Sequence, residues 1–171
     1  LLKLGEVDDS LQHAAQIKDA YSRAYAQMYA ADAVREPARK QEILGEALVH
    51  ARQEPNPARR VVLFGNIAER LFDAGEREAA EALVTEALVP ATELPTADWA
   101  GFARGHYAET LALIDPEEAL ALVKELKDED HRTRHYGNIA HELAASDPEA
   151  AERVLSLIPA QSRDPYTQRV C

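Results

Sequence analysis

The sequence predicts an all-α protein, and three observations support this prediction. Much of the hydrophobic share of 46% is Ala and Leu, which favour helices. No run of four to eight residues alternates apolar and polar side chains as a half-buried strand does. One seven-residue phrase occurs three times, as GNIAERL at 65–71, GHYAETL at 105–111 and GNIAHEL at 137–143. Such self-similarity indicates a chain built from repeated helical units.

Helical periodicity and local start signals place the elements along the chain. The expected helices cover 9–31, 37–53, 57–73, 76–89, 96–113, 116–126, 129–145 and 148–158, and a ninth begins after Asp164. Two helix starts carry the same clear signal: DPEEALALVKEL begins at Asp115, and DPEAAERVLSLI begins at Asp147, one repeat later. In both, Asp supplies an N-cap oxygen, and Pro occupies the first helical position, where no backbone N–H is needed. The Glu residues that follow complement the positive end of the helix.

The other elements follow from the repeat. The first expected helix carries YAQMYA at 25–30, a weaker copy of the phrase without its glycine. Each copy lies late in one helical pattern, and a second helical pattern follows it. The connectors AGE, LPTAD, ALIDPE and AASDPE are short, so consecutive helices are expected to pack antiparallel. The units 9–53, 57–90, 96–126 and 129–158 then form a stack of helical hairpins, an α-solenoid.

These units resemble the tetratricopeptide repeat. The second unit matches the family's alternation of small and large residues at Ile67, Ala68, Leu71, Ala80, Val84 and Ala87, with Phe64 in place of the usual Trp, Gly75 at the turn and Pro90 near the terminal Pro. The later units match at Tyr107, Ala108, Leu111, Ala119, Val123 and Leu126, and at Tyr136, Ile139, Ala140, Leu143, Ala151, Leu155 and Ile158. The glycines recur after 40 and 32 residues instead of the family's 34, so a HEAT-like repeat is the alternative. The resemblance implies a right-handed α-α superhelix of about four antiparallel helix pairs plus the start of a ninth helix.

The repeated glycines need an explanation, because a glycine inside a helix costs about 1 kcal/mol relative to alanine. Close packing against a neighbouring helix is one explanation, since the missing Cβ lets backbones approach. Room for a partner along an inner groove is the other. The substitution Gly105→Leu separates the two: a groove predicts weaker partner capture with unchanged stability, and packing predicts loss of folding.

The polar residues beside the glycines are the candidate partner-binding positions. The resemblance implies that the first helix of each pair lines a concave face, and these residues then point into it. Arg134 joins them from a modest basic cluster to which an acidic peptide can dock. The alternative is a solvated helix face, or side chains that cap neighbouring loops and pair with nearby carboxylates. The candidates are Asn66, Glu69, His106, Glu109, Arg134, Asn138 and His141.

No metal, cofactor or enzyme signature accompanies these candidates. His131 and His135 are four residues apart on one helix face, with Asp128, Asp130 or His141 as further ligands, but no third ligand stands at a recognised spacing. Phosphate-binding loops, nucleophile elbows and dinucleotide-binding turns are absent from the sequence. We therefore predict no metal, no cofactor and no enzymatic activity. An unrecognised active site that uses His135 or His141 is the less favoured reading.

Charge and composition narrow the class of partner. Nineteen Lys and Arg against thirty Asp and Glu give a formal charge of −11, which disfavours binding to nucleic acid and to anionic lipid. No apolar stretch approaches the roughly 20 residues of a transmembrane helix, and one cysteine, Cys171, excludes an internal disulfide. Trp99 and Phe102 are expected to anchor the core between units. The absent initiator Met and the ending DPYTQRVC indicate a fragment of a longer protein, expected to be cytoplasmic.

The predicted function is a protein-interaction scaffold. A solenoid exposes more concave surface than a globule of equal mass, so it gains binding area for another protein or peptide. The alternative is a structural role, as a coat-like or tethering subunit of a larger assembly. The sequence leaves the oligomeric state open.

Overall fold

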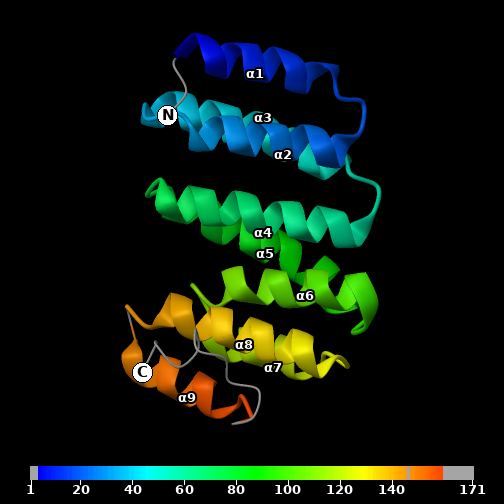
Figure 1. Cartoon of the computed structure of the whole chain (residues 1–171), viewed down its shortest axis with the longest axis vertical. Coiled ribbons are helices and arrows are strands. Elements are labelled where there is room, and N and C mark those ends of the chain that lie inside the picture. The colour runs from blue at the N-terminus through cyan, green and yellow to red at the C-terminus, as the bar shows by residue number, and fades with distance from the viewer. Residues whose placement is uncertain (1–3, 146, 160–171) are drawn as a thin grey trace. The chain divides into compact units, whose positions relative to one another are not determined.

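The computed structural model describes residues 4–145 and 147–159, and every regular element within them is an α-helix (Figure 1). The all-α prediction is confirmed. The helices are α1 (Leu4–Gln16), α2 (Ala20–Asp32), α3 (Pro37–Gln53), α4 (Pro57–Asp73), α5 (Arg77–Glu93), α6 (Asp98–Leu111), α7 (Pro116–Lys124), α8 (Glu129–Leu143) and α9 (Pro148–Ser156). The chain divides into two compact units, unit 1 (Leu1–Ala87) and unit 2 (Leu88–Cys171), with the boundary inside α5.

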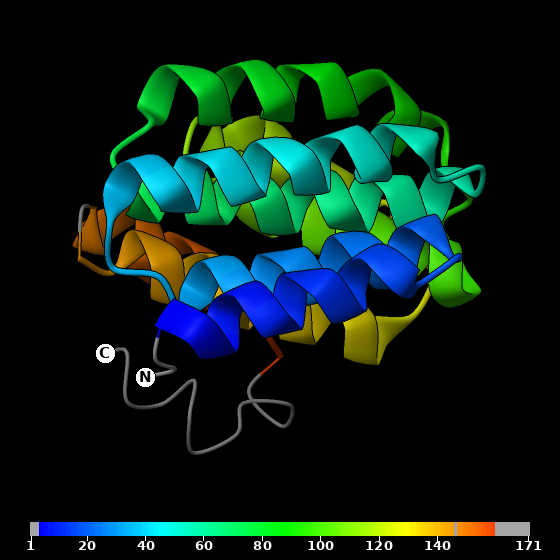
Figure 2. The same ribbon diagram turned by 90° about the horizontal axis from the view of Figure 1, so that it is seen from above.

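Within each unit, helices pack on the next helix in the chain and on the one after it. In unit 1, α2 contacts α1, α3 and α4, and α3 contacts α4. Figures 1 and 2 both show α1 and α2 side by side. In unit 2, α6 contacts α7 and α8, α7 contacts α8, and α8 contacts α9. This order of contacts is typical of helical hairpins that follow one another along the chain.

Local start signals fix most helices where the sequence places them. Helices α3 and α4 have the bounds expected from the sequence, and both begin with Pro after a side-chain cap, Glu36 or Asn56. The two Asp-Pro starts are confirmed: Asp115 accepts a hydrogen bond from the Glu118 N–H at 3.0 Å, and Asp147 accepts one from the Ala150 N–H at 2.9 Å. Helices α6, α7, α8 and α9 end two residues earlier than expected. The ninth expected helix, after Asp164, lies outside the described residues.

The single helix expected at 9–31 is wrong, because α1 ends at Gln16 and α2 begins at Ala20. Asp19 starts α2 as an N-cap, and its carboxylate accepts the Ser22 N–H at 2.8 Å and the Ser22 hydroxyl at 2.6 Å. These hydrogen bonds lower the pKa of Asp19, so the cap stays ionised. The Arg23 Nε donates to the Ile17 carbonyl at 2.6 Å, which satisfies a backbone group that the helix break leaves open.

Two other helices have an arginine at the same distance from the N-cap as Arg23 in α2. Arg60 of α4 donates to the carbonyl of Glu54, six residues before it, at 3.0 Å. Arg132 of α8 donates to the carbonyl of Leu126, again six residues before it. In each case the arginine stands four residues after the Asp or Asn that caps the helix. The pattern is therefore a repeat signal of its own, and it ties each of these helices to the connector before it.

Helix α5 runs past its expected end at 89 and holds Pro90 in its interior. The interior proline removes one helical hydrogen bond. Arg104 of α6 then closes the helix, since its Nη1 donates to the carbonyls of Thr92 and Leu94 at 2.7 Å and 3.4 Å. The Arg104 side chain is buried and also pairs with Glu125. A paired buried guanidinium thus holds the end of α5 against α6 and the end of α7.

The expectation that Trp99 anchors the core is wrong. Its side chain is 49% exposed, at the start of α6, and stacks on Phe102 with ring centroids 5.2 Å apart. The core of unit 2 is filled instead by residues deeper in the helices, of which Tyr107, Leu126, Ile139 and Ile158 are almost fully buried. In unit 1 the corresponding large buried side chains are Met28, Ile43, Leu44, Leu63 and Ile67.

Candidate functional site

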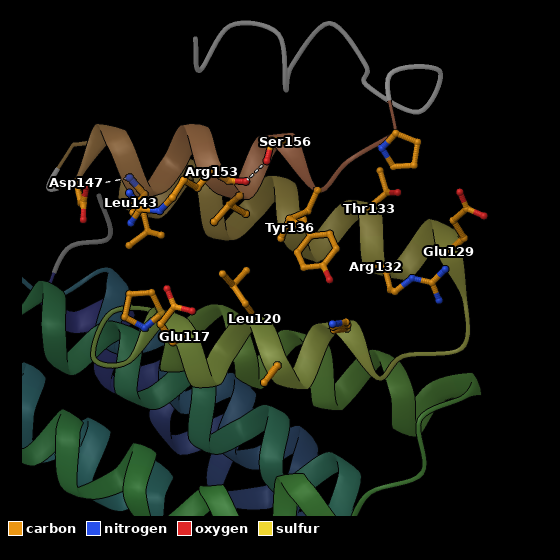
Figure 3. A pocket seen from close by; sticks show the side chains of 17 residues that line it. Glu117, Leu120, Glu129, Arg132, Thr133, Tyr136, Leu143, Asp147, Arg153 and Ser156 are labelled. Carbon is orange, nitrogen blue, oxygen red and sulfur yellow. Dashed lines mark hydrogen bonds between the residues drawn. The ribbon is translucent and has the colours of Figure 1, made fainter.

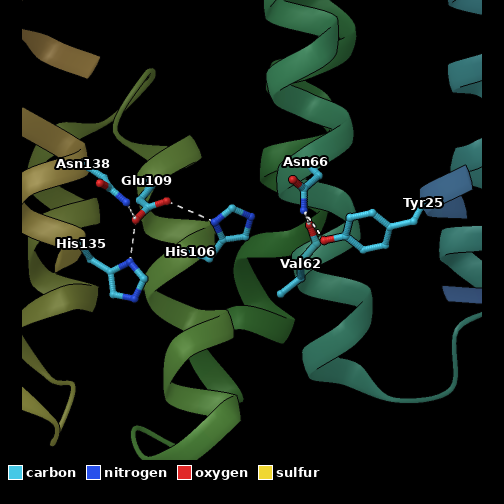
Figure 4. A network of polar contacts seen from close by, with 7 residues as sticks. All are labelled: Tyr25, Val62, Asn66, His106, Glu109, His135 and Asn138. Atoms are coloured by element: carbon cyan, nitrogen blue, oxygen red, sulfur yellow. Dashed lines mark hydrogen bonds and ion pairs between the residues drawn. The ribbon is translucent and has the colours of Figure 1, made fainter. Parts of the chain in front are cut away.

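Three of the predicted partner-binding residues meet in one polar cluster in unit 2, centred on Glu109 (Figure 4). The His106 Nδ1, one turn earlier on α6, donates to Glu109 Oε2 at 3.1 Å. Asn138 of α8 donates its Nδ2–H to Glu109 Oε1 at 2.6 Å. His135, three residues before Asn138 on the same helix, donates from Nδ1 to the same oxygen at 2.6 Å. The Glu109 carboxylate therefore links α6 to α8.

The electrostatics of the cluster keep Glu109 ionised. Its side chain is only 11% exposed, and this burial alone raises the pKa. Hydrogen bonds from His106 and His135, together with the positive charge that these imidazoles carry when protonated, outweigh the burial. They lower the pKa of Glu109 to about 2. A carboxylate with three donors already in place is satisfied within the protein, so we assign the cluster a structural role, not a binding role.

Gly105 belongs to the same cluster, and its neighbour explains the glycine. A Cβ built at Gly105 overlaps the His135 imidazole, which is 1% exposed. The missing side chain is the space in which the imidazole lies. This geometry supports the packing explanation for Gly105. Gly65 and Gly137, the other two repeated glycines, are also buried.

The remaining predicted residues do not join this cluster. Asn66, in unit 1, donates Nδ2–H to the Tyr25 hydroxyl at 3.1 Å and to the Val62 carbonyl at 2.8 Å (Figure 4). Glu69 lies four residues after Gly65 on α4. Arg134 and His141 are exposed on α8. Several of the polar residues predicted to bind a partner are thus engaged in hydrogen bonds within their own unit.

A groove that the sequence reasoning missed opens on another face of α8. It lies between α7, α8 and α9 and has a volume of about 980 Å³ (Figure 3). Leu120 comes from α7, and the exposed Leu157 follows α9. The apolar side chains that line it include Leu120, Tyr136, Leu143, Val154 and Leu157. From the sequence, Tyr136 and Leu143 are identified only as repeat positions.

Charged side chains surround this apolar lining. Arg132 donates a hydrogen bond to the Leu126 carbonyl, just after α7, and Asp147 caps α9. Lys124 and Arg153 make no ion pair with any residue that the structure describes, nor do Glu117 and Glu129. The groove therefore offers an apolar floor with free charges of both signs. Such a lining can hold the apolar face of a peptide and orient its charged residues.

Within residues 4–145 and 147–159, no three His, Cys, Asp or Glu side chains are placed to hold a metal ion, and His131 and His135 have ring centroids 6.3 Å apart. None of the helices in that part of the chain has the length and apolarity to cross a bilayer.

Comparison of the chain with protein-family models, with curated proteins and with solved structures gave no match.

Proposed function

We propose that the protein is an interaction scaffold, and that the groove between α7, α8 and α9 binds a short amphipathic helix of a partner polypeptide. The observation that carries the proposal is the groove itself, with apolar side chains from three helices inside and charges that have no described ion-pair partner around it. The exposed Leu157 adds a large apolar side chain at this surface.

The dimensions of the groove favour a helix as the occupant. Helices α7 and α9 have nine residues each, so each is about 13 Å long. An extended peptide fills that length with only about four residues. A helix places two to three turns along it and presents apolar side chains at i, i+3, i+4 and i+7 to the leucines of the groove.

Charge favours a basic helix. Unit 2 contains eight Lys and Arg against fifteen Asp and Glu, a formal charge of −7. Such a field attracts a cationic peptide and speeds its association. Glu117 and Glu129, two acidic residues of the lining without a described ion-pair partner, are available to pair with lysine or arginine side chains of the bound helix.

The repeat pattern supports an α-solenoid as the scaffold. In both units helices contact the next helix in the chain or the one after it, and capped helix starts followed by an arginine recur in both units. A tetratricopeptide-like or HEAT-like array builds long binding surfaces by this stacking.

The test uses a synthetic Leu-Lys peptide with leucines at helical spacing, titrated into the full chain and followed by two-dimensional NMR. We expect shifts that concentrate on α7, α8 and α9, and weaker binding as salt rises. Leu157→Ser should weaken binding about fivefold, because a half-exposed leucine contributes part of its burial energy. The matched control is Val49→Ser, another half-exposed apolar residue, in unit 1. It should leave the affinity unchanged.

A Leu-Glu peptide with the same leucine spacing controls for charge. It should bind more weakly than the Leu-Lys peptide. Equal affinity of the Leu157→Ser variant and the parent for the Leu-Lys peptide, or shifts scattered over both units, would contradict the proposal.

A further inference from the structure

We infer that the groove between α7, α8 and α9 selects the direction of its partner helix. The bound helix lies antiparallel to α7 and α9, with its basic C-terminal end beside the starts of these two helices. This direction goes one step beyond the proposed function, on which it rests, and it defines the charge pattern that the partner needs. Two features of unit 2 carry it: α7 and α9 run the same way, and the two ends of the groove differ in charge.

Helices α7 and α9 run in the same direction along the two sides of the groove. Only a few residues separate α8 from either of them, so the chain reverses before and after α8. Figure 3 shows the result: Glu117 of α7 lies at the same end of the groove as Leu143, the last residue of α8, and Asp147, the cap of α9. Glu129, the first residue of α8, lies at the opposite end.

The end at which α7 and α9 begin is strongly acidic, and we call it the acidic end. The repeated DPE motif places an aspartate cap and first-turn glutamates there on both helices. Residues 115–118 and 147–149 hold no Lys or Arg and five carboxylates, Asp115, Glu117, Glu118, Asp147 and Glu149. Glu117 and Asp147 line the groove. Arg153 of α9 also lines it, and with this cation included the acidic end has a formal charge of −4.

The opposite end, which we call the mixed end, carries cations as well as carboxylates. Lys124, the last residue of α7, stands seven residues after Glu117, about 10 Å along the helix axis. Residues 124–132 hold three cations against four carboxylates, and one of the four, Glu125, pairs with Arg104. The mixed end therefore has a formal charge of zero. Lys124 lines the groove there and makes no ion pair with any residue that the structure describes.

A helix bound between these ends has one favourable direction. Its lysine and arginine side chains are attracted to the acidic end, and carboxylates of its first turn are attracted to Lys124. Glu117 and Lys124 are seven residues apart, so a carboxylate and a lysine seven residues later on the bound helix reach both when that helix runs antiparallel to α7. This pattern also stabilises the peptide helix itself, because it complements the helix dipole. The partner is therefore an amphipathic helix with an acidic first turn and a basic last turn.

The experiment titrates a synthetic helical peptide and its reversed sequence into the full chain and measures each Kd by NMR. The forward peptide carries glutamates in its first turn, lysines in its later turns, and leucines at i, i+3, i+4 and i+7. This leucine spacing reads the same in both directions, so the two peptides present the same apolar face. The forward peptide should bind about fivefold more tightly, because the reversed one brings like charges together at the ends of the groove.

A nitroxide at the C-terminal end of the forward peptide reports the direction in the parent chain. It should broaden the amide signals of Glu117 and Glu118 more than that of Lys124, and a nitroxide at the N-terminal end should reverse this order. The exchange Glu117→Lys with Lys124→Glu gives both ends a formal charge of −2, so the two Kd values should come within about twofold of each other. Lys18→Glu with Glu78→Lys, an exchange of two exposed residues in unit 1, is the matched control and should leave the fivefold preference unchanged.

Three results would overturn the inferred direction and leave the groove as a binding site. The first is equal affinity of the parent for the two peptides. The second is stronger broadening at Lys124 than at Glu117 by the C-terminal nitroxide, a measurement that needs no variant to fold. The third is an undiminished preference in the exchange variant, because the preference would then come from the helicity of the free peptide. Absence of shifts on α7, α8 and α9 with either peptide refutes the proposed function together with the direction, so the two failures are distinguishable.

Discussion

Replacing Gly105 by alanine tests the packing of the Glu109 cluster directly. In an open helical position this substitution stabilises a protein by about 1 kcal/mol, because glycine loses more backbone entropy on folding. At Gly105 the added methyl group overlaps the buried His135 ring. The imidazole must move, and its hydrogen bond to Glu109 at 2.6 Å must lengthen or break.

The expected size of the effect follows from those contacts. A hydrogen bond to a charged acceptor contributes about 1.5 to 3 kcal/mol. Displacing the ring from its packing against Phe102, with ring centroids 5.5 Å apart, adds an overpacking cost of about 1 kcal/mol or more. After subtracting the gain in helix propensity of about 1 kcal/mol, Gly105→Ala should destabilise unit 2 by about 2 kcal/mol.

Urea unfolding, followed by the fluorescence of Trp99, measures this change in unit 2, since Trp99 is the one tryptophan of the chain. Gly45→Ala in α3 is the matched control, because a Cβ there meets nothing within 4 Å. Circular dichroism should show that it stabilises the protein by about 1 kcal/mol. In a His135→Ala background the ring is gone, so Gly105→Ala should become stabilising. A stabilising effect of Gly105→Ala in the parent chain would refute the reasoning.

Three further predictions concern charge and helix starts. The folded-state pKa of Glu109, about 2, lies below its ordinary value of 4.5. Ionised Glu109 therefore contributes about 3 kcal/mol to the free energy of unfolding above pH 4.5, and this contribution is lost as the pH falls towards 2. Urea unfolding between pH 7 and pH 2 should therefore show a shallower decline in Glu109→Gln than in the parent. Asn56→Ala removes the cap that accepts the Arg59 N–H and should cost about 1 kcal/mol in thermal unfolding. Arg60→Met leaves the Glu54 carbonyl without its donor and should cost about 1 kcal/mol by the same measurement, whereas an unchanged stability would show that water replaces the arginine.

The helices were predictable where their signals are local. Pro37 and Pro57 follow capping side chains, and the two Asp-Pro starts place both the cap and the proline in adjacent residues. Such signals act over one turn, so no knowledge of the tertiary structure is needed. All of these starts lie within a residue of the expected positions.

The break between α1 and α2 was missed because helical periodicity continues through it. The available signal was the pair Asp19 and Arg23, an acidic cap followed four residues later by an arginine. The same spacing joins Asp128 to Arg132, and an Asn takes the place of the Asp before Arg60. A search for capped arginines, added to the search for glycines, would have divided the first helix correctly.

The polar cluster was predicted in part, and the missing part is tertiary. Sequence position singled out His106, Glu109 and Asn138, but it gave no indication that they satisfy one another. Glu109 receives its strongest donors from α8, 26 and 29 residues away in the sequence. Only the packing of α6 on α8 decides whether such a side chain faces a partner or a neighbouring helix.

Helix α8 explains why the cluster and the groove coexist in unit 2. His135 and Asn138 turn towards Glu109 of α6, whereas Thr133 and Tyr136 line the groove beside α7 and α9. Opposite faces of one helix thus serve stability and, under our proposal, binding. A change confined to the Glu109 carboxylate should therefore lower the stability of unit 2 without altering the intrinsic affinity of the groove. The peptide affinity of a Glu109 variant should be measured at a pH and temperature where unit 2 stays folded. If the variant loses affinity as well as stability under these conditions, the cluster also positions the groove.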